Sequence, residues 1–367
     1  MFYNKKICIC GGGNLGHVLI AKMSQNGCVV NLLTNRPKQW SHKIEVIDCF
    51  DKKITGSINK ISDNPEDVIP NSEIILLCLP GYMIEPTLKK IKPFLQKDQI
   101  IGSVVCSNGF FWIANHVLGS EIQLFGFQRV PFICRVKEYG CKAKIEGYKS
   151  LLKISGVNGV SLNEVADFLS MTLDTKTICL SHYLESALTN SNPLIHPARI
   201  YAMLSPYSLD IFDKEILFYE EWNDDSSEIL IDCDKEFQEI LSKLPINREE
   251  MPFVLPYYDS FDARSLTEKI RSIKSFKGIK MCMIKKDDGY VIDYTNRYFT
   301  EDIPYGLLII KSFGELLNVP TPKIDNIIYW MQEKLNKEYL KNGKLVGANI
   351  KETGILQNFG IHSIEDL

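Results

Sequence analysis

The sequence predicts an α/β protein with an N-terminal doubly wound parallel sheet and a mainly α-helical C-terminal domain. Three observations support this. Apolar strands alternate with amphipathic helices through the first half, a glycine-rich turn joins the first strand to the first helix, and the pattern is mostly helical after about residue 180. A chain of 367 residues is long enough for about two domains. We expect residues 1–180 to form the first and residues 181–367 the second.

The first element is a strand, a glycine turn and a helix. Lys6–Cys10 is an apolar run typical of a buried strand, and Val18–Met23 shows the spacing of one helix face. In between lies the G-x-G-x-x-G pattern of a Rossmann-type dinucleotide site. Gly11 permits a tight turn, Gly13 lets the backbone approach a diphosphate, and Gly16 allows helix and strand to pack closely. The diphosphate would lie at the positive end of the helix. The predicted contacts are Gly11, Gly13, Asn14, Leu15 and Gly16. The alternative is a glycine turn without a ligand.

Further strands are expected at Gly27–Leu33, Glu73–Leu79 and Gln99–Cys106, with a helix over Met83–Leu95. Ligands of parallel sheets bind beyond the carboxyl ends of the strands. We therefore expect Leu79 and Pro80, and also the Ser107–Gly109 turn, to face the cofactor.

The remaining elements are expected from local pattern. Short edge strands fall within residues 44–61, and residues 121–155 are strand-like. Helical patterns follow at residues 161–169, 178–191, 215–222, 235–244, 305–317 and 323–341.

Composition narrows the class of protein. Apolar residues make up 45% and charged residues 24% of the chain, as in ordinary globular proteins, and the net charge of −3 argues against a nucleic-acid partner. We find no signal peptide and no apolar stretch long enough to span a membrane, so a cytoplasmic protein is expected. The eleven cysteines and six histidines lack metal-ligand spacing, so no metal is expected.

The end of the second strand indicates which nicotinamide cofactor binds. It reads Thr34-Asn35-Arg36, without the carboxylate that would hydrogen-bond the ribose 2′-hydroxyl of NAD. A carboxylate would repel a 2′-phosphate, whereas an arginine offers several donors and a permanent positive charge. The sequence therefore favours NADP(H) over NAD(H). The alternative is an exposed arginine at the end of a strand.

The segment from Ser191 to Arg199 is the most unusual of the second half. Its two prolines, Pro193 and Pro197, are four residues apart, and proline disrupts a helix interior. We expect the helix that begins at Ile178 to stop or kink at Asn192 and Pro197 to begin the next one. His196 would then lie at the break and project into a cleft as an acid or base. The alternative is a structural histidine.

A second segment, Tyr294–Gly306, supplies a candidate partner for that histidine. Asp302 can hold the imidazole in one tautomer, and Arg297 can bind a substrate carboxylate bidentately. The alternative is a surface salt bridge, with Asp302 as a helix N-cap.

These stretches together resemble the opine dehydrogenase family, also called octopine/nopaline dehydrogenases, from about Lys5 to Gln332. The similarity rests on the glycine fingerprint and on four further segments: Asn192–Pro197, Phe218–Glu220, Arg297 with Glu301–Leu307, and Val319–Asp325. The resemblance implies reductive condensation of an amino acid with a 2-oxo acid such as pyruvate, through an imine, to a secondary amine dicarboxylate. It also implies that His196 is the acid/base group, Asp302 its orienting partner and Arg297 the carboxylate anchor. Asn192, Tyr219 and Trp222 are further candidate residues of the substrate pocket.

Two departures from the family pattern concern the substrate pocket and a loop. Glu221-Trp222 stands where the family has Glu-Gly, and the Cys106–Phe111 turn contains less glycine than expected. A ketopantoate or 2-hydroxy-acid NADP reductase, and an NADP-binding sensor without catalysis, remain alternatives. The sequence names neither the amino acid nor the oxo acid, and it is compatible with both a monomer and a homodimer.

Overall fold

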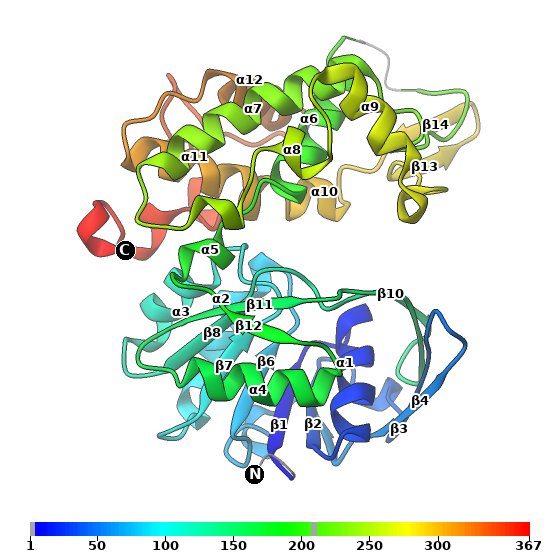
Figure 1. Cartoon of the computed structure of the whole chain (residues 1–367), viewed down its shortest axis with the longest axis vertical. Helices are drawn as coiled ribbons and strands as arrows, with labels where there is room; N and C mark the ends of the chain where they lie inside the picture. Colours follow the sequence, from blue (N-terminus) through cyan, green and yellow to red (C-terminus); the bar gives the residue numbers. More distant parts are fainter. Residues whose placement is uncertain (1–3, 207–210) are drawn as a thin grey trace. The chain divides into compact units, whose positions relative to one another are not determined.

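The computed structural model describes residues 4–206 and 211–367. Its backbone divides into two compact units, Met1–Ala187 and Leu188–Leu367 (Figure 1). The predicted boundary, after residue 180, falls between strand β12 (Thr177–Cys179) and the short helix α5 (Leu184–Ala187), both of which belong to the first unit.

The first unit is built on an eight-stranded sheet in the order β12-β11-β8-β7-β6-β1-β2-β5. Adjacent strands of this sheet are parallel, except for β8 and β11, which pair antiparallel. Parallel neighbours in a sheet need a crossover connection, which is usually a helix. The chain between β8 and β11 forms a β-hairpin and contains no helix, which is consistent with their antiparallel pairing. The predicted Rossmann-type sheet is thus confirmed, with one antiparallel pair that the sequence did not indicate. Its strands are β1 (Lys6–Cys10), β2 (Val29–Leu33), β5 (Lys60–Ser62), β6 (Ile74–Leu77), β7 (Ile100–Ser103), β8 (Gln123–Phe127), β11 (Leu152–Val157) and β12.

Helices cover both faces of this sheet (Figure 1). Helix α1 (Asn14–Gln25) contacts α4 (Leu162–Leu173), and α2 (Gly81–Ile91) contacts α3 (Phe110–Leu118). Strands covered on both faces are expected to be apolar throughout, and Ile7, Ile9 and Leu76 are fully buried. The alternation of strand and helix seen in the sequence therefore corresponds to a doubly wound core.

A second sheet of four strands packs against α1. It has the order β4-β3-β10-β9 and consists of β3 (Lys43–Ile47), β4 (Lys53–Ser57), β9 (Phe132–Glu138) and β10 (Lys142–Tyr148). The strands expected within residues 44–61 and 121–155 are present. Their assembly into one sheet through the parallel β3–β10 pair is a tertiary feature. The turn between β9 and β10 reaches the dinucleotide region.

The second unit is mainly helical, as predicted. It contains α6 (Asn192–Leu204), α7 (Asp224–Ser242), α8 (Val254–Tyr257), α9 (Ala263–Ser272), a hairpin of β13 (Met283–Lys286) and β14 (Gly289–Ile292), α10 (Arg297–Thr300), the π-helix η6 (Ile303–Leu307), α11 (Leu308–Leu316) and α12 (Pro322–Lys334). Helices α6 and α7 pack against each other. No helix in the described parts of the chain has the length and apolar character needed to cross a membrane.

Four local expectations for this part of the chain are wrong. The helix expected over residues 323–341 ends at Lys334. Residues 178–191 do not form one helix, because they contain the end of β12, a turn and α5. Residues 215–222 are irregular. Pro197 does not begin a helix, since α6 starts at Asn192, carries Pro193 in its first turn and continues through Pro197. A proline in the first turn costs no hydrogen bond, and burial of Leu194, Ile195 and Ala198 offsets the donor lost at Pro197.

Candidate functional site

The glycine turn between β1 and α1 has the geometry that a dinucleotide site requires. Gly11 has a φ of +117°, and a Cβ there would lie 2.5 Å from the Cys78 carbonyl oxygen. A Cβ on Gly16 would lie 2.2 Å from the Gly11 carbonyl oxygen, so helix and strand are too close for any side chain. A Cβ on Gly13, in contrast, would meet nothing within 4 Å. Two glycines are therefore required by the fold, and the third leaves open space for a ligand.

The N-terminus of α1 follows this open space. The first intrahelical bond runs from the His17 N–H to the Gly13 carbonyl (3.2 Å), so the N–H groups before it have no partner within the helix. Such N–H groups and the positive helix end bind anions. Leu15 and Gly16, which are predicted to contact the cofactor, lie in this first turn. The Asn14 side chain, also predicted to contact the cofactor, accepts a hydrogen bond from the Val136 N–H (2.7 Å) and thus also fastens β9 to the helix.

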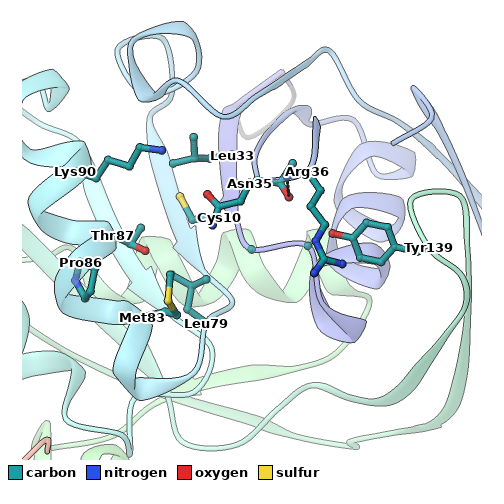
Figure 2. Close-up of a pocket in the computed structure, with 13 residues that line it drawn as sticks. Cys10, Leu33, Asn35, Arg36, Leu79, Met83, Pro86, Thr87, Lys90 and Tyr139 are labelled. Carbon is teal, nitrogen blue, oxygen red and sulfur yellow. Dashed lines mark hydrogen bonds between the residues drawn. The ribbon is translucent and has the colours of Figure 1, made fainter. Parts of the chain in front are cut away.

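A cavity of about 340 Å³ lies beside the glycine turn (Figure 2). Of the predicted cofactor residues, Gly11, Thr34, Asn35, Arg36 and Leu79 line it. The others, Gly13, Asn14, Leu15, Gly16 and Pro80, do not. The sequence did not single out the remaining lining residues, which are Cys10, Gly12, Leu33, Met83, Pro86, Thr87, Lys90 and Tyr139. Most of these come from α2 and from the β9–β10 turn, which only the folded chain brings to the end of β2.

The lining of this cavity is positively charged. Arg36 and Lys90 are its two basic residues, and it contains no carboxylate. The Lys90 ammonium group donates to the Asp63 carbonyl (2.7 Å), whereas the Arg36 guanidinium lies 5.8 Å from the centre of the Tyr139 ring. A cavity of this size and positive charge can hold the adenosine part of an NAD(P) cofactor.

His196 lies in α6 within a buried hydrogen-bonded group. Its Nδ1 is 2.7 Å from Asp302 Oδ2, and its Nε2 is 2.9 Å from the Tyr219 hydroxyl. The relative exposures are 4% for His196, 5% for Asp302 and 7% for Tyr219. Asp302 makes no side-chain cap to the following helix, so the N-cap alternative is wrong. The carboxylate accepts from Nδ1–H, which leaves Nε2 as the ring nitrogen for proton exchange.

Arg199, one turn after His196, holds the segment that carries Tyr219. Its Nε donates to the Phe218 carbonyl (3.1 Å) and its Nη2 to the Glu221 carbonyl (2.6 Å). Burial lowers the pKa of Arg199 to about 10, and no carboxylate hydrogen-bonds to it. Hydrogen bonds from a buried guanidinium, and not the backbone hydrogen bonds of a helix, thus hold the irregular backbone of residues 218–221.

Aromatic rings surround the imidazole. The ring centres of Tyr298 and Phe218 lie 4.4 Å and 5.6 Å from that of His196, and Phe276 stacks on Tyr219 at 4.1 Å. Burial raises the pKa of Tyr219 well above its usual range, and the positive charge of Arg297 only partly opposes this. Tyr219 therefore remains a neutral hydroxyl that can either donate to Nε2 or accept from it.

The other two predicted substrate residues lie at exposed helix starts in the same unit. Arg297 is the first residue of α10, and within the described residues its guanidinium has no hydrogen-bond or ion-pair partner, which rules out the salt-bridge alternative. Asn192 is the first residue of α6. Trp222 is fully buried, and its indole N–H donates to the Ser227 hydroxyl (2.9 Å). The tryptophan that stands at residue 222 in place of the family's glycine is therefore a buried core residue.

Comparison with known proteins decides the family. The profile described as NAD/NADP octopine/nopaline dehydrogenase, alpha-helical domain, matches residues 179–335, and that of ketopantoate reductase PanE/ApbA matches residues 7–116. Octopine dehydrogenase of Pecten maximus is 27% identical over 98% of this chain and 98% of its own length. A solved octopine dehydrogenase with NADH and L-arginine superposes with a TM-score of 0.88 at 26% identity, over 99% of this chain and 97% of that one. The chain belongs to the opine dehydrogenase family.

Membership defines the class of enzyme. The protein is an NAD(P)-dependent oxidoreductase of the type that acts on CH–NH bonds, and its cofactor is NAD(P)H. Yersinopine dehydrogenase with NADP⁺ has a TM-score of 0.72 over 98% of this chain and 99% of its own, but at 12% identity the likeness shows the fold alone. The solved structures that this chain resembles thus include one with NADH and one with NADP⁺.

Proposed function

We propose that the protein is an NADPH-dependent opine dehydrogenase. It condenses the amino group of an amino acid with a 2-oxo acid such as pyruvate and reduces the resulting imine to a secondary amine dicarboxylate. The observation that carries the proposal is the buried pair of His196 and Asp302, at 2.7 Å, with Arg297 unpaired in the same unit. The solved octopine dehydrogenases with NADH and L-arginine, and with NADH and pyruvate, support these substrate classes.

His196 is the proton-transfer residue in this proposal. Asp302 keeps the proton on Nδ1 and stabilises the imidazolium, so Nε2 exchanges a proton with the reacting nitrogen or oxygen of the substrate. That atom takes the place of the Tyr219 hydroxyl at Nε2. In the oxidative direction His196 takes the proton of the secondary amine, and in the synthetic direction it returns one. The nicotinamide, when bound, supplies or accepts the hydride.

Arg297 anchors the oxo acid. A guanidinium presents paired donors that match a carboxylate, and no side chain in the described part of the protein uses those of Arg297. Asn192 is the second proposed substrate contact, as a neutral amide at the start of α6.

Arg36 selects NADPH in this proposal. The 2′-phosphate of that cofactor carries the charge that distinguishes it from NADH, and the cavity offers Arg36 and Lys90 without a carboxylate. Gly11, Gly13, Asn14, Leu15 and Gly16 hold the diphosphate, and Thr34, Asn35, Leu79 and Pro80 the remainder of the nucleotide. Titration of the purified protein tests the choice, since tighter binding of NADH than of NADPH would contradict it.

A substrate matrix tests the reaction. NADPH oxidation is followed at its absorbance band while amino acids are varied against 2-oxo acids, with each also supplied alone. We expect turnover only when both are present, and mass spectrometry of the product should show the secondary amine. Oxidation with an oxo acid alone would support a ketopantoate or 2-hydroxy-acid reductase, which the match of residues 7–116 favours as the second candidate. NADPH binding without turnover under any pairing would support a sensor.

A further inference from the structure

The turn between β9 and β10 forms part of the wall of the nucleotide cavity, although it is far from the glycine turn in sequence. Gly140 has a φ of +77°, and a Cβ there would lie 1.9 Å from the Gln39 carbonyl oxygen, so this position requires glycine. The Ser41 N–H donates to the Gly140 carbonyl (2.9 Å). The segment after β2 thus holds this turn, together with its neighbour Tyr139, against the end of β2.

His17 holds the same turn from the opposite side. The Gly140 N–H donates to His17 Nε2 (2.8 Å), so Nε2 carries no proton. His17 Nδ1 carries it instead and donates to the Gly13 carbonyl (2.8 Å). The buried imidazole therefore links the glycine turn to the β9–β10 turn, and its ring contacts that of Tyr139 at 5.4 Å.

Tyr139 in turn lies between the glycine turn and Arg36. A Cβ on Gly12 would lie 2.8 Å from the Tyr139 hydroxyl, which shows how closely the ring approaches the turn. The Arg36 guanidinium lies over the ring, 5.8 Å from its centre, at the end of the cavity that Figure 2 shows. Within the described residues the Arg36 side chain has no hydrogen-bond acceptor, so its N–H donors are available to a ligand.

We propose that Tyr139 is a specificity-determining residue for NADPH, which positions the Arg36 guanidinium to bind the ribose 2′-phosphate. The inference rests on the proposed function, in which Arg36 selects NADPH. A flexible arginine at the end of a strand loses side-chain freedom when it binds a phosphate. An aromatic face that already supports the guanidinium reduces this loss and leaves the edge donors directed at the phosphate. Tyr139 is thus a positioning residue that acts through Arg36.

A double-mutant cycle tests this mechanism on the full chain. Dissociation constants for NADPH, NADH and 2′,5′-ADP are measured by calorimetry for the wild type, Arg36→Ala, Tyr139→Ala and the double variant. We expect Arg36→Ala to weaken NADPH and 2′,5′-ADP about tenfold or more, and NADH little. Tyr139→Ala should weaken the same two ligands about three- to fivefold. In the Arg36→Ala background, Tyr139→Ala should change the NADPH to NADH ratio no further.

Two control variants separate this role from a general one. Tyr139→Phe keeps the ring and should retain the wild-type ratio. Lys38→Ala removes an exposed positive charge outside the cavity lining and should leave the ratio unchanged, which excludes a long-range charge effect.

The outcomes distinguish this inference from the cofactor choice beneath it. If Arg36→Ala weakens NADPH selectively but Tyr139→Ala does not, the role of Tyr139 is wrong and the cofactor choice stands. If Tyr139→Ala weakens NADPH and NADH equally, Tyr139 supports the common part of the site, and the inference is also overturned. If the wild type binds both cofactors equally and Arg36→Ala changes neither, the cofactor choice fails and the inference with it.

Discussion

The two candidate sites of this protein are built in different ways. The proposed diphosphate site uses six consecutive residues, Gly11 to Gly16, and would act through backbone shape and backbone N–H groups. The His196 site uses side chains from three segments, since Tyr219 and Asp302 lie 23 and 106 residues further along the chain. A site made of backbone can be recognised from a short pattern. A site made of side chains exists only when distant segments pack together.

The two sites also differ in their environment. Arg36 and Lys90 line an open cavity, where a bound phosphate would keep part of its hydration and salt would screen its attraction to the two cations. His196 and Asp302 are enclosed by aromatic rings, where a hydrogen bond to a charged group is stronger and an unpaired charge is more costly. We therefore expect mutations at the first site to change affinity, and mutations at the second to change turnover.

Replacement of the imidazole should give the largest effect. His196→Ala removes the proposed proton-transfer group, and we expect turnover to fall about 10³-fold or more, while NADPH affinity stays near that of the wild type. Steady-state rates and calorimetric titration measure the two quantities. His362→Ala, which removes an exposed histidine of the same unit, should leave both unchanged. A His196→Ala variant that kept most of its activity would exclude the proposed role.

Replacement of the orienting carboxylate should have the next largest effect. Asp302→Asn keeps the size of the side chain but cannot stabilise an imidazolium, and we expect turnover to fall about 10²-fold or more. Asp287→Asn, at the exposed β13–β14 turn, serves as the matched control. An equal decrease in both variants would mean that the loss at Asp302 reflects net charge and not its bond to His196.

A methyl group in the glycine turn should weaken both cofactors alike. Gly16→Ala places a Cβ 2.2 Å from the Gly11 carbonyl oxygen, so the backbone must shift at a cost of about 1–3 kcal/mol. We expect lower affinity for NADPH and for NADH, together with a lower unfolding temperature. Gly13→Ala, where the Cβ meets no protein atom, should weaken cofactor binding and leave the unfolding temperature unchanged. Equal unfolding temperatures for Gly16→Ala and the wild type would contradict this account of the turn.

The smallest predicted effect is on stability as a function of pH. Burial lowers the pKa of His17, although the Gly13 carbonyl acts to raise it. Because the unfolded chain binds a proton more readily, the contribution of His17 to stability is complete above about pH 6.5 and is lost as the pH falls through the lower folded pKa. His17→Gln can keep the acceptor for the Gly140 N–H but cannot titrate. Chemical unfolding between pH 7.5 and pH 5 should therefore show a shallower loss for His17→Gln, and parallel curves would refute the prediction.

Predictions from sequence succeeded where a pattern and its consequence are local. The β1–turn–α1 unit was predicted correctly because glycine positions and apolar periodicity act over a few residues. Around Pro197 the local rule failed. The sequence predicted a new helix there, yet α6 runs through this proline because the apolar face that includes Leu194 and Ala198 is buried. Here packing outweighed backbone propensity.

Two tyrosines have partners that the sequence did not indicate: Tyr219, which was only a candidate pocket residue, and Tyr139, which was not singled out. Tyr219 lies in an irregular segment held by the buried Arg199, and Tyr139 lies in a turn held by His17 and Ser41. Nothing in the residues next to either tyrosine indicates which distant group it meets. The Phe218–Glu220 stretch contributed to the family resemblance, but it did not indicate the hydrogen bond between Tyr219 and Nε2 of His196.

The sequence by itself determined the sheet with its glycine turn, the helical character of the second half, the candidate acid, base and arginine, and the family. Periodicity, turn chemistry and charge are properties of neighbouring residues, and these are what a sequence records directly. Only the tertiary structure decided that Nδ1 of His196 meets Asp302, that its Nε2 meets Tyr219, and that Arg36 lies over Tyr139. These contacts join segments far apart in the chain, and burial of their apolar surroundings brings them together.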